Sequence, residues 1–412
     1  MRRMAWALVL VAACASDDVR ADWPQFRGPG GQGHADAKSL PLEWSESENV
    51  AWKTAIPGKG WSSPVIADGR IWLTTALDDG KSLRAICARA ADGRILHDVE
   101  VFAPDEPVFI HGKNSYASPT PLLDRGRVFV HFGTMGTAAL DASTGKLLWK
   151  NEELTIDHET GPGVSPVLFR NLLIVPFDGT DRQFVAALDA ETGKVVWNRD
   201  RSATLSEQPS KRRAFSTPLV IDVNGKPQLI SPGADRLYAY DPATGTELWH
   251  VRYEGYANVP RVVAGDGLVY VCTGYGKPQL WAVRVDGTGD VTETHVAWKF
   301  TGQVPAKPSP VLVGKRIYLV HDQGTALCVN AETGETVWQT RLGGNYSASP
   351  LYAAGRIHFC SEEGKTTVLA PADEPRVLAT NELADGFMAS PAVSDGALFL
   401  RTMTSLYRIE NK

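Results

Sequence analysis

The chain has 412 residues, and its 42 Lys and Arg against 47 Asp and Glu give a formal net charge of −5, which argues against a broad basic surface for nucleic acid. Hydrophobic residues make up 43% and charged residues 22%, which is enough apolar material for a large core and too little excess charge for disorder. The 38 Gly, 26 Pro and 12 Trp suit many short strands joined by turns better than long helices.

Residues 1–21 are predicted to be an export signal. A positively charged start precedes a short apolar run at residues 5–13, and small residues follow. Two cleavage sites compete: residues 19–21 form the favoured site for ordinary signal peptidase, whereas residues 11–14 resemble a lipobox that would leave Cys14 as a lipid anchor. No other apolar stretch is long enough to span a bilayer. The predicted location is therefore the periplasm or cell envelope.

Residues 22–48 are expected to form an N-terminal extension. Its Gly28–Gly33 stretch formally matches GxGxxG, but no strand precedes the stretch and no helical pattern follows it, so a dinucleotide site is not indicated. We expect a flexible or loosely docked segment with Trp23 and Phe26 as its apolar anchors.

Four cysteines follow the signal segment, each inside an apolar, strand-like run: Cys87, Cys272, Cys328 and Cys360. An even number of cysteines in an oxidising compartment permits disulfides. Because no spacing pairs them, buried free thiols are the favoured interpretation.

Two sequence phrases recur in phase along the chain. The first, DxxTGxxxW, ends at Trp149, Trp197 and Trp249, and a copy with Asn330 in place of Asp ends at Trp338; degenerate copies end at His97, Trp298 and about position 378. The second is Ser-Pro or a variant of it, and its eight prolines, 40 to 55 residues apart, are Pro64, Pro119, Pro166, Pro218, Pro260, Pro310, Pro350 and Pro391. Turn signals such as Asp-Gly lie between the two phrases, so each unit is predicted to contain four short antiparallel strands.

Eight such units predict an all-β fold, an eight-bladed β-propeller of four-stranded antiparallel blades over residues 49–412. The last unit supplies only three strands, while residues 49–54 form an isolated strand near the start. We therefore expect the N-terminal strand to complete the eighth blade and close the ring. The outer-strand tryptophans expected to dock against neighbouring blades are Trp52, Trp149, Trp197, Trp249, Trp298 and Trp338.

The phrase AxDxxTGxxxW at residues 139–149, 187–197 and 239–249 resembles the tryptophan-docking motif of the pyrroloquinoline-quinone-like (PQQ-like) repeat family. The resemblance covers roughly residues 50–409 and implies one of two branches. Quinoprotein alcohol dehydrogenases hold the quinone and calcium at the mouth of an eight-bladed propeller. The BamB-like branch is non-catalytic and includes a lipoprotein of the outer-membrane β-barrel assembly machine. Residues 22–33 also look like the mature start of exported members of the family.

The enzymatic branch is matched less well. The chain lacks the pair of adjacent cysteines of the dehydrogenases, and no stretch matches their calcium-binding Glu, Asn and Asp. His158-Glu159 begins like a zinc motif, but Pro162 stands where the second His belongs. Hydrolase, nucleotide, zinc-finger and EF-hand patterns are also missing. We therefore expect no catalytic residue, no metal site and no cofactor, with a PQQ- and calcium-dependent dehydrogenase as the alternative.

The loops that precede each Ser-Pro phrase should gather around one mouth of the central channel. This mouth is the candidate site for a protein partner or a small polar ligand, although a solvated rim is the alternative for any one residue. The candidate binding residues are Trp61, Asn114, Tyr116, Arg213, Phe215, Tyr256, Asn258, Lys307, Asn345, Tyr346 and Phe387. A second set, on the turns after each second strand, is Asp178, Asp181, Asp235, Asp322 and Glu362. The predicted function is a monomeric, exported binding or scaffolding module.

Overall fold

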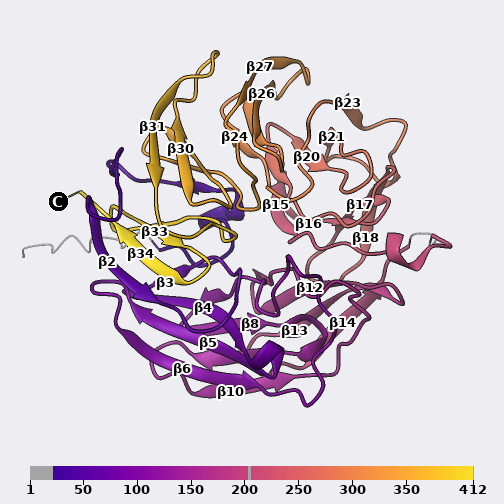
Figure 1. The fold of residues 1–412 in the computed structure, drawn as a ribbon. Coiled ribbons are helices and arrows are strands. Elements are labelled where there is room, and N and C mark those ends of the chain that lie inside the picture. The colour runs from indigo at the N-terminus through magenta and orange to yellow at the C-terminus, as the bar shows by residue number, and fades with distance from the viewer. Residues whose placement is uncertain (1–21, 203–205, 412) are drawn as a thin grey trace, which may run out of the picture.

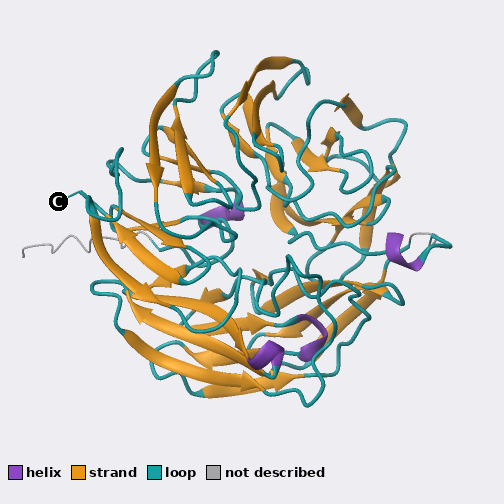
Figure 2. Cartoon of the chain, viewed as in Figure 1, coloured by secondary structure: helices purple, strands orange, loops and turns teal. Residues whose placement is uncertain are grey.

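A computed structural model describes residues 22–202 and 206–411, so the expected signal segment and Cys14 lie outside the described residues. Eight antiparallel sheets stand like blades around a central channel (Figure 1). The predicted eight-bladed, four-stranded β-propeller is confirmed. Helical structure among the described residues is limited to short 3-10 turns (Figure 2), which are η1 (Pro29–Gly31), η2 (Asp78–Gly80), η3 (Gly133–Met135) and η4 (Pro209–Lys211).

The blades follow one another in chain order, and their strands are given from the channel outward. Blade 1 contains β3 (Val65–Ala67), β4 (Arg70–Leu77), β5 (Ser82–Arg89) and β6 (Ile95–Phe102). Blade 2 contains β7 (Leu122–Asp124), β8 (Arg127–His131), β9 (Thr137–Asp141) and β10 (Leu147–Asn151). Blade 3 contains β11 (Val167–Phe169), β12 (Leu172–Asp178), β13 (Gln183–Asp189) and β14 (Val195–Asp200). Blade 4 contains β15 (Leu219–Val223), β16 (Lys226–Gly233), β17 (Arg236–Tyr240) and β18 (Glu247–Arg252).

The second half of the ring repeats this arrangement. Blade 5 contains β19 (Val263–Gly265), β20 (Leu268–Cys272), β21 (Leu280–Arg284) and β23 (Val296–Phe300). Blade 6 contains β24 (Val311–Val313), β25 (Arg316–Val320), β26 (Thr325–Asn330) and β27 (Thr336–Arg341). Blade 7 contains β28 (Leu351–Ala353), β29 (Arg356–Cys360), β30 (Lys365–Leu369) and β31 (Val377–Glu382). Blade 8 contains β32 (Ala392–Ser394), β33 (Ala397–Arg401), β34 (Ser405–Ile409) and β2 (Val50–Ala55).

The burial of each strand follows from its place in the blade. The middle strands β12 and β13 are buried along nearly their whole length, because both faces are covered by neighbouring blades, and their sequences are correspondingly apolar. The outer strands β10 and β14 expose most residues and bury Trp149 and Trp197. The four expected cysteines are free and buried.

Tryptophans of the outer strands pack on the turn of the following blade. The Trp149 indole donates to the Ala190 carbonyl at 3.1 Å, and its ring covers Gly193, where a side chain would overlap the ring. Equivalent indole bonds to the next blade are made by Trp52 to Ala90, Trp298 to Ala331 and Trp338 to Ala372, and the Trp197 ring lies against Gly245. Trp249 differs because it donates to Gln228 of its own blade, where the two-residue strand β22 (Gly289–Asp290) runs parallel to β18.

The ring is closed by strands from the two ends of the described chain. Strand β2 pairs antiparallel with β34, with Val50 opposite Ile409 and Lys53 opposite Tyr407. The predicted completion of the eighth blade by the N-terminal strand is therefore confirmed. No helix in the part of the chain that the structure describes is long and apolar enough to cross a membrane.

The N-terminal extension is docked into the ring, contrary to the expectation of a loosely attached segment. Residues 22–44 are here called the N-terminal plug. Trp23 of the plug pairs with Ile66 of blade 1, and the Pro24 carbonyl accepts a hydrogen bond from the Leu123 amide of blade 2. The plug then crosses the channel to blade 5, where Arg261 donates to the Phe26 carbonyl at 2.7 Å. Farther on, β1 (His34–Ala35) joins blade 7 parallel to β28.

Trp23 is a buried anchor of the plug, with 1% of its surface exposed. Leu40 and Trp44, near the end of the plug, are each 3% exposed and pack into the same core as Trp23. The Gly-rich part between these anchors is held largely by hydrogen bonds, in which Gln32 accepts from the Ala264 amide and His34 bonds to the Leu312 carbonyl. A Gly-rich segment held in this way carries no hydrophobic periodicity, which is why the sequence pattern did not indicate its docking.

Candidate functional site

A ring of hydroxyl groups lines the channel at the starts of the inner strands. Each hydroxyl oxygen accepts an amide hydrogen from the blade before it at 2.9–3.0 Å, as in Ser63 amide to Thr120 and Ser390 amide to Ser63. The members of this hydroxyl collar are Ser63, Thr120, Ser165, Thr217, Ser309, Ser349 and Ser390. Blade 5 has Arg261 at the equivalent position, and its amide donates to Ser309.

The hydroxyl collar corrects the predicted phase of two repeats. In blade 2 the collar residue is Thr120, followed by Pro121, so Pro119 lies two residues earlier than its counterparts. In blade 5 the equivalent pair is Arg261-Val262, and Pro260 precedes it. Proline occurs near the correct point in both blades, which is why its spacing alone misplaced the repeat.

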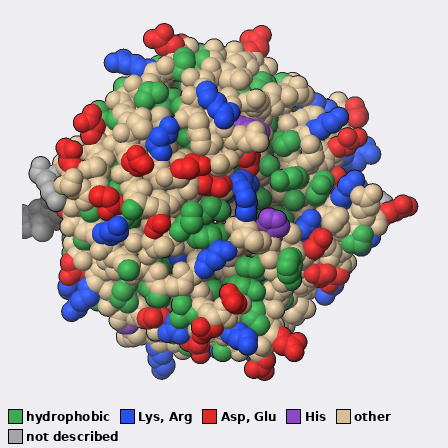
Figure 3. Space-filling model, in the orientation of Figure 1, with side chains coloured by type: hydrophobic (Ala, Val, Ile, Leu, Met, Phe, Trp, Pro, Cys, Tyr) green, Lys and Arg blue, Asp and Glu red, His purple; other side chains and the backbone are tan. Residues whose placement is uncertain are grey.

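A cavity of about 470 Å³ opens above the hydroxyl collar and is here called the mouth cavity. All seven collar residues line it, and Phe26 of the N-terminal plug lies in its lining. The molecular face in Figure 3 is hollowed near its centre, with hydrophobic side chains gathered among Lys and Arg. Because the plug crosses the channel beneath the collar, the mouth cavity is a cup with Phe26 in its floor.

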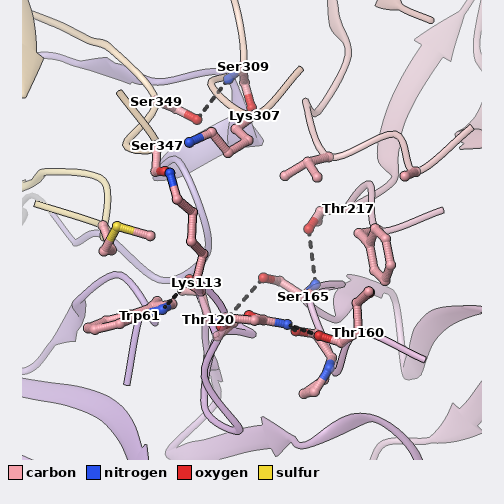
Figure 4. Close-up of a pocket in the computed structure, with 18 of the residues that line it drawn as sticks. Trp61, Lys113, Thr120, Thr160, Ser165, Thr217, Lys307, Ser309, Ser347 and Ser349 are labelled. Atoms are coloured by element: carbon pink, nitrogen blue, oxygen red, sulfur yellow. Dashed lines mark hydrogen bonds between the residues drawn. The ribbon is translucent and has the colours of Figure 1, made fainter. Parts of the chain in front are cut away.

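Apolar and aromatic side chains form much of the wall of the mouth cavity: Trp61, Phe215, Tyr256, Val259, Tyr275 and Met388. Tyr256 and Tyr275 pack together with ring centroids 6.4 Å apart, and 58% of the Tyr275 surface is exposed. The Trp61 indole donates to the Lys113 carbonyl at 3.0 Å, which ties the wall to the loop between blades 1 and 2 (Figure 4). An exposed aromatic wall of this kind is typical of a binding surface.

Basic side chains line the same cavity, while their acidic partners lie outside its lining. Lys307 Nζ is 2.9 Å from Glu362 Oε1 and 3.8 Å from Asp322, and Lys113 Nζ is 4.0 Å from Glu362. Both lysines extend toward Ser347 in Figure 4, and the Ser347 hydroxyl donates to Glu362 at 2.6 Å. Partial burial opposes ionisation of Glu362, but the Ser347 and Lys307 hydrogen bonds and the nearby lysine charges lower its pKa overall.

Three long loops bring further polar groups to the mouth. Arg213 is 8% exposed, and its Nη1 lies 3.1 Å from Glu159 and 3.3 Å from the Thr160 hydroxyl. Asn114 donates to the Thr160 carbonyl at 2.9 Å. These bonds connect the loops of blades 1, 2 and 3, so one side of the mouth is built from insertions rather than from the repeat.

The structure brings together six of the predicted rim residues: Trp61, Asn114, Arg213, Phe215, Tyr256 and Lys307 line the mouth cavity. The other five do not line it. Asn258, Tyr346 and Phe387 are at most 1% exposed, so their expected surface placement is wrong. Tyr116 packs against Gly80, and Asn345 is exposed and bonded to Glu363.

Burial explains the misplaced side chains, because these loops fold back over the blades. The Asn258 amide, for example, donates to the Tyr253 hydroxyl and the Cys272 carbonyl. Position in a loop before Ser-Pro alone could not distinguish a side chain directed into the channel from one directed under the loop.

The predicted carboxylates also lie outside the cavity lining. Asp178 is buried and forms a bidentate ion pair with Arg201 at 2.5 and 2.7 Å. Asp181 accepts the Asp157 amide, and Asp235 accepts the Gly255 amide. Asp322 and Glu362 reach the cavity only through their basic partners. These carboxylates therefore hold loops in place.

Several lining residues were not among the predicted binding residues. They include Phe26 from the plug, Tyr275, Met388 and the hydroxyl collar. The recurrence of Ser or Thr before Pro was a usable signal for the collar, because it repeats with the blades. Phe26 had no such signal, because its place depends on a contact across the channel.

The donor set at the mouth does not fit calcium. Calcium takes about six to eight oxygen ligands, usually with carboxylates among them. None of the described residues that line the mouth cavity is Asp or Glu, and the charged ones are Lys113, Arg213 and Lys307. No group of three or more His, Cys, Asp or Glu in the described ranges could hold a metal ion. The site expected for a quinone with bound calcium is therefore not reproduced.

A family model described as "Outer membrane protein assembly factor BamB" matches residues 42–153, 135–277 and 233–408. The chain belongs to this family. A BamB relative from Alkalilimnicola ehrlichii is 24% identical over 190 residues, which are 45% of this chain and 47% of the relative. The aligned region thus spans about half the length of that relative.

Solved structures of BamB and of a quinone enzyme share the fold. BamB from Moraxella catarrhalis has a TM-score of 0.61 at 13% identity, covering 88% of this chain and 97% of that one. Quinohemoprotein alcohol dehydrogenase from Comamonas testosteroni has a TM-score of 0.67 at 13% identity, covering 95% of this chain and 81% of that one. Because both branches have the same fold, the choice between them depends on the site.

Proposed function

We propose that this chain is an exported, non-catalytic β-propeller that binds an extended segment of another envelope protein in its mouth cavity, as a factor in outer-membrane protein assembly. The observation that carries the proposal is the cup itself, with exposed aromatic walls, polar loops and a closed floor. Aromatic anchors beside hydrogen-bonding groups suit an extended polypeptide, which offers apolar side chains and backbone polar groups together. The name of the BamB family supports the assembly role.

The first test measures binding of an unfolded outer-membrane β-barrel protein, diluted from urea, by fluorescence anisotropy of a label on that protein. We expect saturable binding to the purified chain. The double variant Tyr256→Ala/Tyr275→Ala should weaken binding at least about tenfold, because it removes a packed aromatic pair from the wall. Val196→Ala, at an exposed position on outer strand β14, is the control and should bind as the wild type does. Absence of binding, or equal binding by the double variant, would contradict the proposal.

The alternative is a PQQ- and calcium-dependent dehydrogenase, which the shared fold supports. Titration with PQQ and Ca²⁺, followed by absorbance and by a dye-coupled alcohol assay, separates the two functions. We expect neither a saturable spectral change nor turnover, because the mouth cavity offers no carboxylate to the metal. Saturable quinone binding with alcohol oxidation would replace the binding function with the enzymatic one.

A further inference from the structure

The floor of the mouth cavity limits what can reach the hydroxyl collar. The N-terminal plug is bonded to blades 1 and 2 on one side of the channel and to blade 5 on the other, and Phe26 lines the cavity. An extended chain can therefore enter the cup but cannot pass through it. A chain end reaches the collar more easily than the middle of a segment, which would have to make a tight turn inside the cavity.

The hydroxyl collar offers hydrogen-bond donors to whatever enters. A hydroxyl group has one hydrogen to donate and two lone pairs to accept. In every collar bond the hydroxyl oxygen is the acceptor, as in Thr120 amide to Ser165 and Ser349 amide to Ser390. Among the described residues no acceptor is paired with these seven hydrogens, so they are available to a ligand rich in acceptor oxygens.

The charges at the mouth favour an anion over a cation. Lys113, Arg213 and Lys307 line the cavity, while Glu159, Asp322 and Glu362 lie outside the lining. Although these charges pair with one another, a ligand in the cup meets the positive groups first, which favours an anion. With 69% of its side chain exposed, Lys113 can turn toward a bound anion. An N-terminal ammonium would instead be repelled by these cations.

We propose that the mouth cavity binds the C-terminal end of an extended polypeptide, with the α-carboxylate over the hydroxyl collar and the preceding side chains against the aromatic wall. This proposal deepens the proposed function and rests on it. The volume of about 470 Å³ lies within the usual range for ligand sites. Hydrogen bonds to a carboxylate are roughly twice as strong as neutral ones, so the chain end supplies the specificity and the wall supplies apolar contact.

The test compares two labelled decapeptides of alternating Thr and Val, one with a free C-terminal carboxylate and one with a C-terminal carboxamide. Fluorescence anisotropy at low and high NaCl measures their affinities for the full chain. We expect the carboxamide to bind at least about tenfold more weakly. The advantage of the carboxylate peptide should shrink as salt rises, because screening weakens the attraction of the lysines.

Variants identify the groups that recognise the carboxylate. Lys113→Gln/Lys307→Gln should lower affinity for the carboxylate peptide toward that of the carboxamide and leave the carboxamide nearly unaffected. Lys146→Gln/Lys194→Gln, at exposed positions on the outer turns of blades 2 and 3, removes the same number of charges elsewhere and should leave both affinities unchanged. Ser165→Ala should reduce the same discrimination, and a thermal melt of each variant checks that the ring is intact.

The outcomes separate this proposal from the function on which it rests. Equal affinity for the two peptides would overturn the carboxylate assignment, even while the unfolded β-barrel protein still bound. A carboxamide peptide with a penultimate Asp that bound as tightly as the free acid would show that any carboxylate suffices, and would overturn the preference for a chain end. Failure of both the peptides and the unfolded protein to bind would remove the proposed function as well.

Discussion

At the scale of single residues, His158 connects the loop after blade 2 to the turn between β8 and β9. Its Nε2 accepts the Thr134 amide at 2.9 Å, which requires an unprotonated nitrogen. Burial lowers the pKa of His158 to about 4, although the Asp157 and Asp181 charges oppose the shift. Between pH 6.5 and pH 4 the unfolded chain therefore takes up a proton that the native chain does not, and the free energy of unfolding falls as the pH falls.

This linkage predicts the behaviour of His158→Gln. Between pH 7 and pH 4.5 the wild type should lose about 2 kcal/mol more stability than the variant, since each pKa unit corresponds to about 1.4 kcal/mol. Urea unfolding at the two pH values measures the difference. His321→Gln, at a less buried histidine, is the control and should follow the wild type. Parallel losses in the wild type and His158→Gln would show that this ring does not contribute to the acid sensitivity.

At the scale of elements, the N-terminal plug depends on two adjacent glycines that differ in their surroundings. Gly30 and Gly31 have φ of 69° and 70°, a region that costs a side-chain-bearing residue about 1–2 kcal/mol. A Cβ on Gly31 would overlap the Arg261 guanidinium, whereas a Cβ on Gly30 has no heavy atom within 4 Å. Gly30→Ala and Gly31→Ala therefore carry a similar backbone penalty, and only Gly31→Ala also disturbs the contact with blade 5.

We therefore predict that Gly31→Ala lowers stability by about 1–3 kcal/mol more than Gly30→Ala does, because of the added overlap. Thermal unfolding of the two variants beside the wild type measures this excess. Equal thermal midpoints for the two variants would show that the plug can shift away from Arg261 without lowering the stability of the ring.

The same scale shows what the sequence could predict. The blades were predictable because each repeats a local pattern, in which a proline starts the inner strand and a tryptophan such as Trp149 marks the outer one. The mouth was predictable only in outline. Whether Phe26 reaches the floor or Tyr346 turns inward depends on contacts between segments far apart in the chain, and no local spacing encodes such contacts.

At the scale of the whole molecule, strand β2 closes the ring, whereas the N-terminal plug just before it closes the channel. Strand β2 completes blade 8, and its Trp52 indole donates to Ala90 of blade 1 at 3.0 Å. The plug before it spans the channel without contributing to that sheet. Closure of the ring removes the free edge that β34 would otherwise present.

Two truncated chains distinguish closure of the ring from closure of the channel. Residues 50–412 keep β2 and lose the plug, so we expect a closed, monomeric ring with a lower thermal midpoint. Residues 57–412 also lose β2, which leaves the β34 edge unpaired and the Gly93 turn without its indole cover. This second chain should unfold over a broader range and self-associate, as followed by circular dichroism and size-exclusion chromatography. Full-length Trp52→Ala separates the indole from the strand. Because this indole is only partly buried, the substitution should cost less than the roughly 3–5 kcal/mol of a core tryptophan and leave the protein monomeric. If residues 57–412 unfolded as sharply as residues 50–412 and at the same midpoint, β2 would not be what holds the ring closed.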